Sequence, residues 1–172
     1  MAVDGRTTLA LKDGTRVPVR RIEARDAAAL QRLVGRSSTR SIELRFFGPL
    51  KELSDEMARK FSDLDGKDRY ALVALDPEEQ EEIVGVVRYG REEGTDGAEY
   101  AALIEDRFQH RGLGIGLTRK LIQAARENGI RRLHALVMRE NADMLGLLRS
   151  LDLPERMRWQ DGAELVEIEL AD

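Results

Sequence analysis

The sequence predicts an α+β domain: a mixed, mostly antiparallel, twisted sheet of about seven strands flanked by about four helices. Two observations lead to this prediction. Three apolar runs follow one another in the middle of the chain, at residues 70–75, 83–89 and 98–104. The short intervals between them indicate an antiparallel meander, because a parallel connection needs a crossover of a dozen or more residues. Helical patterns with one apolar face precede and follow this block.

The segment before the meander is predicted to form a hairpin and helices. Residues 8–24 have the pattern of two strands joined by Asp13 and Gly14, a pair that suits a tight turn because both residues tolerate positive φ. Asp26 is expected to cap the first helix. Residues 37–50 are weakly periodic, so we expect a helix remnant followed by a loop.

The remaining elements are also marked by caps and apolar spacing. Ser54 is expected to cap a further helix before the meander. After the meander, residues 113–125 carry apolar side chains at four-residue steps, which predicts a helix with one buried face. Residues 133–138 are predicted to form a strand and residues 141–151 a helix, and Gly162 separates two short final strands.

Length and composition bound the function classes. The 172 residues fit one domain, 1–172, in which residues 1–16 form an N-terminal extension or edge strand. Cysteine is absent, which excludes a thiolate metal site, and we predict no metal. The net charge is −4, whereas nucleic-acid-binding domains are more often basic. No apolar run approaches the roughly 18 residues of a membrane span. We therefore expect a cytoplasmic protein that binds neither nucleic acid nor a membrane.

Three glycines, Gly112, Gly114 and Gly116, stand between the last run of the meander and the next helix. A glycine-rich entry to a helix lets backbone N–H groups approach an anion, which favours a phosphate ligand. A nucleoside triphosphate loop would need lysine after its last glycine, but Leu117 follows Gly116. A dinucleotide fingerprint that starts at Gly112 would need glycine at Leu117 and an acidic residue near Arg132. The segment therefore matches neither of these two familiar phosphate-binding loops.

A third pattern fits this loop, namely Gln/Arg-x-x-Gly-x-Gly/Ala between a core strand and its helix. Every fixed position is satisfied by the segment Gln109-His110-Arg111-Gly112-Leu113-Gly114. In this pattern the chain resembles the GNAT superfamily of N-acetyltransferases, and the resemblance extends over nearly the whole chain. It implies the GNAT fold and a loop that holds the pyrophosphate of acetyl-coenzyme A (acetyl-CoA).

Three segments upstream of the loop resemble a narrower group within the superfamily. Residues 44–49 (LRFFGP), 53–54 (LS) and 68–74 (DRYALVA) are similar to bacterial protein lysine acetyltransferases. Members of that group are often fused to a cyclic-nucleotide-binding or other regulatory domain, for which we see no counterpart in these residues. This narrower resemblance implies protein lysine as the acceptor.

The resemblance also implies cofactor contacts beyond the loop. In the superfamily the strand before the loop splays from its neighbour, which would place Ala101, Ala102 and Leu103 along the pantetheine arm, with a backbone N–H as the oxyanion donor. Asn141 could bond the pantetheine amide or simply cap its helix. His110 stands where the family commonly has glycine, and it could touch phosphate or face solvent.

Glu99 is the predicted general base. A lysine amine has a pKa of about 10.4, so it is protonated at neutral pH, and a positioned carboxylate is the usual remedy. Glu99 begins the strand before the loop, which resembles the placement of the general-base glutamate in protein acetyltransferases of the superfamily. Strand alternation puts it on the same face as Ala101 and Leu103. The alternative is a solvated strand-end residue, because a turn at Asp96 and Gly97 precedes it.

The remaining candidates are Leu148, Glu105 and residues 45–47. Leu148 stands where many superfamily members carry a tyrosine that protonates the leaving thiolate, so we assign no general acid. Glu105 is expected to be a solvated acid. Arg45, Phe46 and Phe47 could line the acceptor entrance, although phenylalanine is more often a core residue.

These observations together predict an acetyl-CoA-dependent N-acetyltransferase that acts on an amine, with protein lysine as the favoured acceptor. A small-molecule amine acetyltransferase is the alternative within enzymes. A non-catalytic acyl-CoA sensor is the alternative outside them: Glu99 favours the enzyme, and Leu148 favours the sensor. The sequence does not indicate an oligomeric state.

Overall fold

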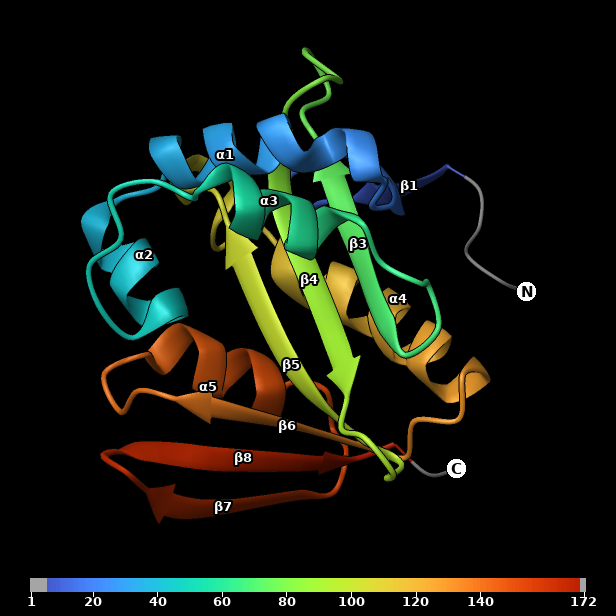
Figure 1. Cartoon of the computed structure of the whole chain (residues 1–172), viewed down its shortest axis with the longest axis vertical. Helices are drawn as coiled ribbons and strands as arrows, with labels where there is room; N and C mark the ends of the chain where they lie inside the picture. The colour runs from blue at the N-terminus through green and yellow to red at the C-terminus, as the bar shows by residue number, and fades with distance from the viewer. Residues whose placement is uncertain (1–5, 171–172) are drawn as a thin grey trace.

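The computed structural model describes residues 6–170. Within that range eight strands form one sheet, in the order β1-β2-β3-β4-β5-β6-β8-β7 (Figure 1). The strands are β1 (Thr7–Ala10), β2 (Arg16–Arg21), β3 (Arg69–Leu75), β4 (Ile83–Arg91), β5 (Gly97–Ile104), β6 (Arg132–Val137), β7 (Glu155–Gln160) and β8 (Ala163–Glu169). The predicted α+β class is confirmed, with one strand more than the estimate from sequence.

Five α-helices and two 3-10 turns accompany the strands over the same described residues. They are η1 (Ala24–Asp26), α1 (Ala27–Arg36), α2 (Thr39–Phe46), α3 (Asp55–Ser62), η2 (Asp106–Phe108), α4 (Leu113–Glu127) and α5 (Ala142–Arg149). The weakly periodic stretch contains α2, which Ser38 caps by accepting a hydrogen bond from the backbone N–H of Ser41. The predicted cap of α3 is confirmed, because Ser54 Oγ accepts the backbone N–H of Met57 at 3.1 Å.

The antiparallel meander is confirmed for β3, β4 and β5. The two central strands of the site, β4 and β5, pair over seven residues, in a register that sets Arg88 opposite Ala101 and Gly90 opposite Glu99. The pair β5–β6 is parallel and short, running only from Gly97 to Glu99 along β5. Beyond that point the two strands separate, and their backbones open a wedge in the middle of the sheet.

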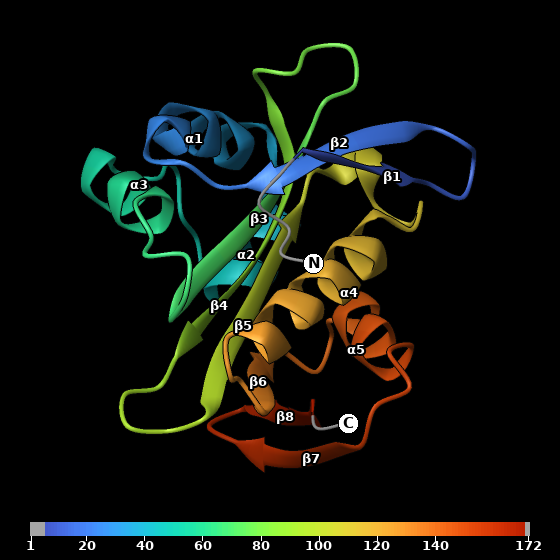
Figure 2. The same ribbon diagram turned by 90° about the vertical axis from the view of Figure 1, so that its right-hand side faces the viewer.

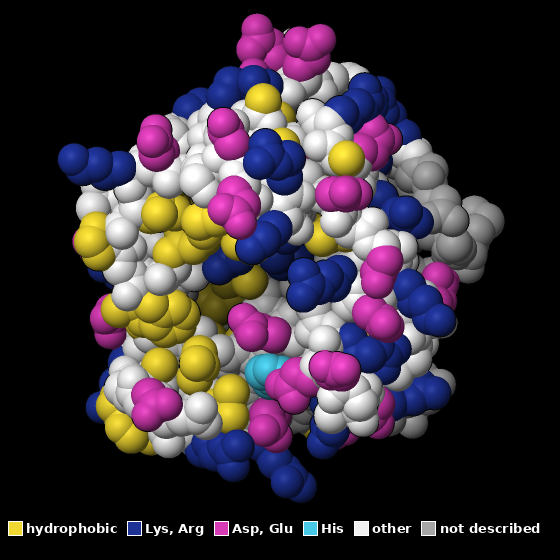
Figure 3. Space-filling model, in the orientation of Figure 1, with side chains coloured by type: hydrophobic (Ala, Val, Ile, Leu, Met, Phe, Trp, Pro, Cys, Tyr) yellow, Lys and Arg dark blue, Asp and Glu magenta, His cyan; other side chains and the backbone are white. Residues whose placement is uncertain are grey.

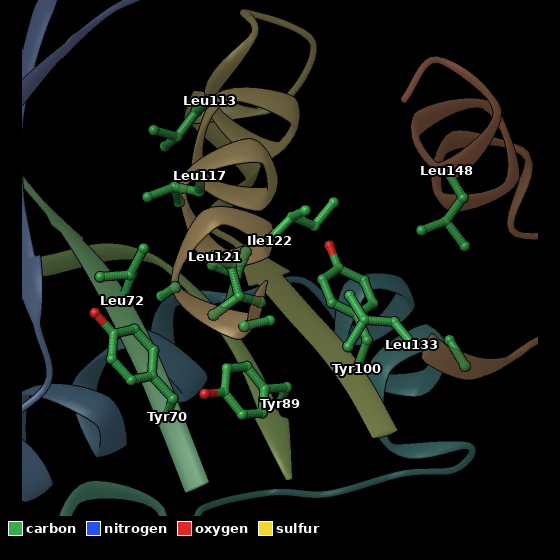
Figure 4. Packing of buried hydrophobic residues seen from close by; sticks show 14 of the residues in the cluster. Tyr70, Leu72, Tyr89, Tyr100, Leu113, Leu117, Leu121, Ile122, Leu133 and Leu148 are labelled. Atoms are coloured by element: carbon green, nitrogen blue, oxygen red, sulfur yellow. The ribbon is translucent and has the colours of Figure 1, made fainter. Parts of the chain in front are cut away.

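Helices cover both faces of the sheet (Figure 2). Helices α1, α2 and α3 lie on one side, while α4 and α5 lie on the other. The α4 side holds the larger core, in which Leu113, Leu117 and Leu121 are almost fully buried and point toward the sheet (Figure 4). The apolar residues predicted at four-residue steps along this helix therefore form its packing face. The α1 side has a separate core that includes Leu33, Val73 and other buried residues.

The predicted cap at Asp26 is wrong in its chemistry, although α1 begins at the next residue. The Asp26 carboxylate makes no cap hydrogen bond to that helix. It instead receives two hydrogen bonds from the Arg20 guanidinium, at 2.7 and 2.9 Å, and one from the backbone N–H of Glu23 at 2.8 Å. A carboxylate that is 5% exposed needs a charged partner, and the bidentate arginine provides one.

Candidate active site

A cleft of about 1040 Å³ occupies the wedge between β5 and β6. It continues from the N-terminus of α4 on one side of the sheet to α2 and the β6–β8 strands on the other. The second of these openings is the hollow seen in Figure 3, where apolar side chains lie beside side chains of both charges. A cleft that crosses the sheet can hold one ligand from each side with their ends in contact.

The exposed backbone of β5 forms the middle of the cleft. Ala101, Ala102 and Leu103 all line it, as the resemblance implied. They lie beyond the last residue that pairs with β6, so this edge of β5 has no strand partner there. The alanine side chains are small and half-buried, which leaves room for a ligand to run close to the backbone. Backbone N–H groups in such a place suit an oxyanion donor.

Gln109 fixes the loop that leads from β5 into α4. Its side-chain amide donates hydrogen bonds to the backbone oxygen of Ile104 at 2.9 Å and to Ser41 Oγ at 3.1 Å. The loop is therefore tied both to the end of β5 and to α2. Gln109 lines the cleft, but its amide nitrogen already has these two partners.

The three glycines are needed for three different reasons. Gly112 is the residue before α4 and has φ of 91°, a conformation that disfavours any side chain. A Cβ at Gly114 would stand 2.9 Å from Leu147 of α5, and one at Gly116 would stand 2.6 Å from Leu9 of β1. Gly112 and Gly114 line the cleft, whereas Gly116 serves only the packing of β1 on α4.

Two side chains of the loop lie away from the cleft. The Arg111 guanidinium reaches the N-terminal hairpin, where it donates to Asp13 Oδ2 at 2.9 Å and to Thr15 Oγ1 at 3.1 Å. Leu113 is 1% exposed and belongs to the core. Only the backbone groups of these two residues could contact a phosphate, which is what a helix N-terminus offers.

The positive groups at the phosphate end come from elsewhere in the chain. Lys12 and Arg119 both line the cleft near the start of α4. Lys12 belongs to the N-terminal hairpin, and its backbone N–H donates to the Arg111 oxygen at 2.9 Å. His110 also lines the cleft, with φ of 61° and its Nε2 3.3 Å from Asp143. Sequence reasoning missed Lys12, because about a hundred residues separate it from the loop it approaches.

Glu99 lies where β5 leaves β6, at the entrance from the α2 side. It is exposed, lines the cleft and pairs in register with Gly90 of β4 and His134 of β6. A Cβ added at Gly90 would meet no atom within 4 Å, so the space beside the Glu99 side chain is open. His134 lines the same region and its Nε2 lies 2.8 Å from Glu92.

The charge of Glu99 acts on Arg45, and Arg88 lies beside Arg45. Burial lowers the pKa of Arg45, and the nearby charge of Glu99 opposes that shift. Burial also lowers the pKa of Arg88 to about 9, and repulsion from Arg45 adds to the effect. Both guanidinium groups therefore lie in a partly desolvated place. Arg45 was a candidate from sequence, whereas Arg88 was not, because nothing in an apolar strand pattern marks it.

Comparisons with known proteins agree with this geometry. A model of the GNAT acetyltransferase family matches residues 37–152. The acetyltransferase PA5475 of Pseudomonas aeruginosa is 31% identical over 159 residues, which are 91% of this chain and 84% of that protein. The chain belongs to the GNAT acetyltransferase family. It is accordingly an N-acetyltransferase of the kind that uses acetyl-CoA.

Solved structures extend the comparison. The GNAT domain of S. lividans PAT superposes with a TM-score of 0.88 at 30% identity, covering 95% of this chain and 96% of that one. The PaiA N-acetyltransferase of Thermoplasma acidophilum, solved in complex with coenzyme A, gives 0.71 at 14% identity, over 89% and 98%. A cAMP-binding acyltransferase from Mycobacterium smegmatis gives 0.69 at 19% identity, covering 98% of this chain but 48% of that one. The last two likenesses show the fold alone.

The α5 segment of this GNAT chain supplies a helix cap but no general acid for the leaving thiolate. Asn141 Oδ1 accepts the backbone N–H of Met144 at 3.1 Å, so the capping role is present, and Asn141 also lines the cleft. Leu148 is 3% exposed and packs in the core, where Figure 4 shows it pointing from α5 toward Tyr100. A thiol has a pKa of about 8.5, so its thiolate is an acceptable leaving group without a dedicated acid.

The expectation for Glu105 is wrong. This carboxylate is 5% exposed rather than solvated. It receives hydrogen bonds from Arg36 and Arg107, which lie on α1 and η2. A carboxylate removed from water needs charged partners, and the two arginines provide them. Glu105 therefore joins α1 to the loop after β5 and has a structural role outside the cleft.

No cluster of three or more His, Cys, Asp or Glu side chains with metal-binding geometry occurs among residues 6–170. In the same part of the chain, no helix has both the length and the apolar character that a membrane crossing requires.

Proposed function

We propose that the chain, as one domain over residues 1–172, transfers the acetyl group of acetyl-CoA to the ε-amino group of protein lysines in the cytoplasm, with Glu99 as the general base. The position of Glu99 carries this proposal. It lies at the junction between the unpaired backbone of Ala101–Leu103 and the open acceptor side of the cleft. The likeness to the GNAT domain of S. lividans PAT, at 30% identity, favours protein as the acceptor.

The residues of the cleft fit acetyl-CoA. We assign the pyrophosphate to the N-terminus of α4, where Gly112 and Gly114 leave the backbone accessible and Lys12 and Arg119 supply positive charge. We assign the pantetheine arm to the free edge of β5 and to Asn141. The thioester then lies near Glu99.

The acceptor ammonium loses two protons in the transfer, one before the attack and one after it. Glu99 accepts the first proton of the lysine ammonium, directly or through a water molecule. The free amine attacks the carbonyl carbon of the thioester, so that a C–N bond forms while a backbone N–H of Ala101–Leu103 stabilises the oxyanion. The C–S bond then breaks, the new amide nitrogen releases its second proton to solvent, and the thiolate takes a proton from solvent. No step requires an acid at Leu148.

The first experiment incubates the protein with labelled acetyl-CoA and a cell lysate, followed by gel separation and mass spectrometry. We expect label on the ε-amino groups of protein lysines. Label confined to small amines would favour the small-molecule enzyme. Tight binding of acetyl-CoA without transfer to any amine would favour the sensor and contradict the proposal.

The second experiment tests the base with Glu99→Gln. We expect turnover at neutral pH to fall on the order of 10²–10⁴-fold, because the amine then loses its proton acceptor. Affinity for acetyl-CoA should hardly change, and part of the activity should return as pH rises toward the pKa of the amine. Glu93→Gln is the matched control, because Glu93 is exposed and does not line the cleft. Equal pH–rate profiles for Glu99→Gln and wild type would show that Glu99 is structural.

A further inference from the structure

The acceptor side of the cleft has two poles of different charge. Near β6 and β8 it is lined by Glu92, Glu99 and Glu167 with Arg132 and Arg158 among them (the acidic pole), whereas Arg45 lines it from α2 (the basic pole). In Figure 3 basic side chains lie along one margin of the hollow and acidic side chains along the other. An amine is attracted to the acidic pole, where the predicted base lies. The basic pole has no role in the proton transfer described above.

Arg88 lies beside Arg45 and lines the small neighbouring cavity rather than the cleft itself. Arg88 pairs with Ala101, and Glu99 is two residues before Ala101, so all three side chains emerge on one face of the sheet. Diagonal neighbours of this kind are separated by roughly 7–8 Å. The Arg88 guanidinium lies over the Phe61 ring at 4.6 Å, and its one hydrogen bond among the described residues goes to the Phe61 backbone oxygen at 3.1 Å.

Arg45 approaches the same place from α2. Its guanidinium lies over the ring of Phe46 at 4.6 Å. Within residues 6–170 it makes no hydrogen bond and no ion pair shorter than 4.0 Å, although it is half-buried. Arg45 and Arg88 also border a small cavity of about 20 Å³ against Ala101. The two groups therefore hold many unused N–H donors around one small space.

Several other arginines of this chain are paired with carboxylates, although Arg126 bonds only to the backbone oxygen of Leu170. Arg20 binds Asp26 at 2.7 Å, and Arg36 binds Glu82 at 2.9 Å and Glu105 at 3.2 Å. Pairing of this kind is the general rule for charges removed from water. The pair Arg45–Arg88 departs from it, since the closest opposing charge acting on it is the single Glu99 carboxylate, beyond ion-pair distance. Two adjacent cations without a counter-charge point to an anion supplied by a ligand.

We infer that Arg45 and Arg88 form an anion-binding subsite for the acceptor, and that the preferred acceptor carries a carboxylate close to the amine that is acetylated. This inference rests on the proposed function, because it names the substrate class of the same site. Two guanidinium forks can bind a carboxylate through several N–H donors at once. The amine then lies at Glu99, across the diagonal of the sheet. The carboxylate could belong to an acidic side chain beside a target lysine or to a free amino acid.

Two pairs of matched acceptors distinguish a carboxylate on a neighbouring side chain from the carboxylate of a free amino acid. The first pair is the blocked peptides acetyl-Gly-Glu-Lys-Gly-amide and acetyl-Gly-Gln-Lys-Gly-amide, which differ by one carboxylate. The second pair is free lysine and cadaverine, which differ by the α-carboxylate. We expect kcat/KM to be about 10- to 100-fold higher for the acidic member of at least one pair, as for hydrogen bonds to a charged group. The pair that shows the preference identifies the source, and no preference in either pair would overturn the inference.

The variant Arg45→Gln tests whether Arg45 is responsible for the preference for the acidic acceptor. It should remove the preference, so that kcat/KM for the acidic member of the pair falls to the value for the neutral member. Arg88→Lys, which keeps one charge but loses the fork, should weaken the preference. Arg59→Gln is the matched control, because Arg59 is an exposed arginine on the neighbouring α3. An undiminished preference in Arg45→Gln would assign the discrimination to other residues and overturn the inference.

A binding measurement keeps this test independent of turnover. Calorimetry with the coenzyme A-loaded protein and the two acceptor pairs reports the subsite even if wild type acetylates none of them. Tighter binding of the acidic member of either pair to wild type, lost in Arg45→Gln, would support the subsite although the proposed function had failed. Equal binding of the two peptides, together with equal binding of free lysine and cadaverine, would overturn the subsite, whatever the catalytic result.

Discussion

At the scale of single residues, the glycines of the loop show that one residue type can meet unrelated demands. Gly112 is required by its backbone conformation, whereas Gly114 and Gly116 are required by close packing against Leu147 and Leu9. Gly146, in the middle of α5, meets neither demand, because a Cβ there would contact nothing within 4 Å. Alanine substitution should therefore have opposite effects at different glycines.

We expect Gly112→Ala to lower the free energy of unfolding by about 1–2 kcal/mol, the usual cost of a left-handed conformation for a residue with a Cβ. It should also weaken acetyl-CoA binding, because relief of that strain moves the backbone of the loop. Gly146→Ala is the matched control, and it should raise the free energy of unfolding by up to about 1 kcal/mol through helix propensity. Urea denaturation of both variants measures the two effects. A loss of stability in Gly146→Ala, or none in Gly112→Ala, would contradict this account.

At the scale of elements, the start of α4 is held to β5 by a buried hydrogen-bond chain. Tyr100 of β5 bonds to Thr118 Oγ1 at 2.7 Å, and Thr118 Oγ1 donates to the Gly114 backbone oxygen at 2.7 Å. Burial raises the pKa of the Tyr100 hydroxyl to about 12, so it is neutral at any physiological pH. The chain links the strand that would carry the thioester to the helix turn that would carry the pyrophosphate.

We expect Thr118→Val to lower the free energy of unfolding by about 1–3 kcal/mol, because it leaves the buried Tyr100 hydroxyl without a partner. The double variant with Tyr100→Phe removes both polar groups and should recover part of that loss. Thermal or urea denaturation of the single and double variants measures the coupling. If the two substitutions simply added their costs, the hydroxyls would not form a stabilising pair.

At the scale of the whole molecule, the cleft depends on segments that are far apart in the chain. The N-terminal hairpin brings Lys12, α2 brings Arg45, and the β6–β8 strands bring His134 and Glu167 to a wedge that β5 defines. A ligand that fills the cleft should therefore stabilise the fold as a unit. The end of the cleft at the N-terminus of α4 and the end beside α2 open on opposite faces of the sheet. The cosubstrate and the acceptor can therefore enter separately.

We expect acetyl-CoA at about 100 times its dissociation constant to stabilise the native state by roughly 2.7 kcal/mol. For a chain of this size this is a rise in Tm of roughly 5–10 °C. NAD and ATP at the same concentration should raise Tm far less, because the loop lacks both of their sequence patterns. Thermal denaturation with the three ligands measures this. An equal rise with NAD would mean that the cleft recognises phosphate without selecting acetyl-CoA.

The sequence by itself determined the class of the fold, the meander, the packing face of α4 and the family, because all of these depend on local patterns. Apolar periodicity reports which face is buried, and a six-residue motif reports a loop conformation that few sequences adopt. It also placed Glu99 on the same face as Ala101 and Leu103, since strand alternation is a local property.

Only the tertiary structure decided which polar groups meet. The N-terminal hairpin brings Lys12 to the glycine loop, β4–β5 pairing sets Arg88 beside Ala101, and packing of α1 on the loop after β5 buries Glu105. The sequence suggested Asp26 as a cap and Glu105 as a solvated acid, and both failed for one reason. Each carboxylate is buried and bonds to arginine, and local patterns do not report that a charged residue is buried, because burial depends on how the elements pack.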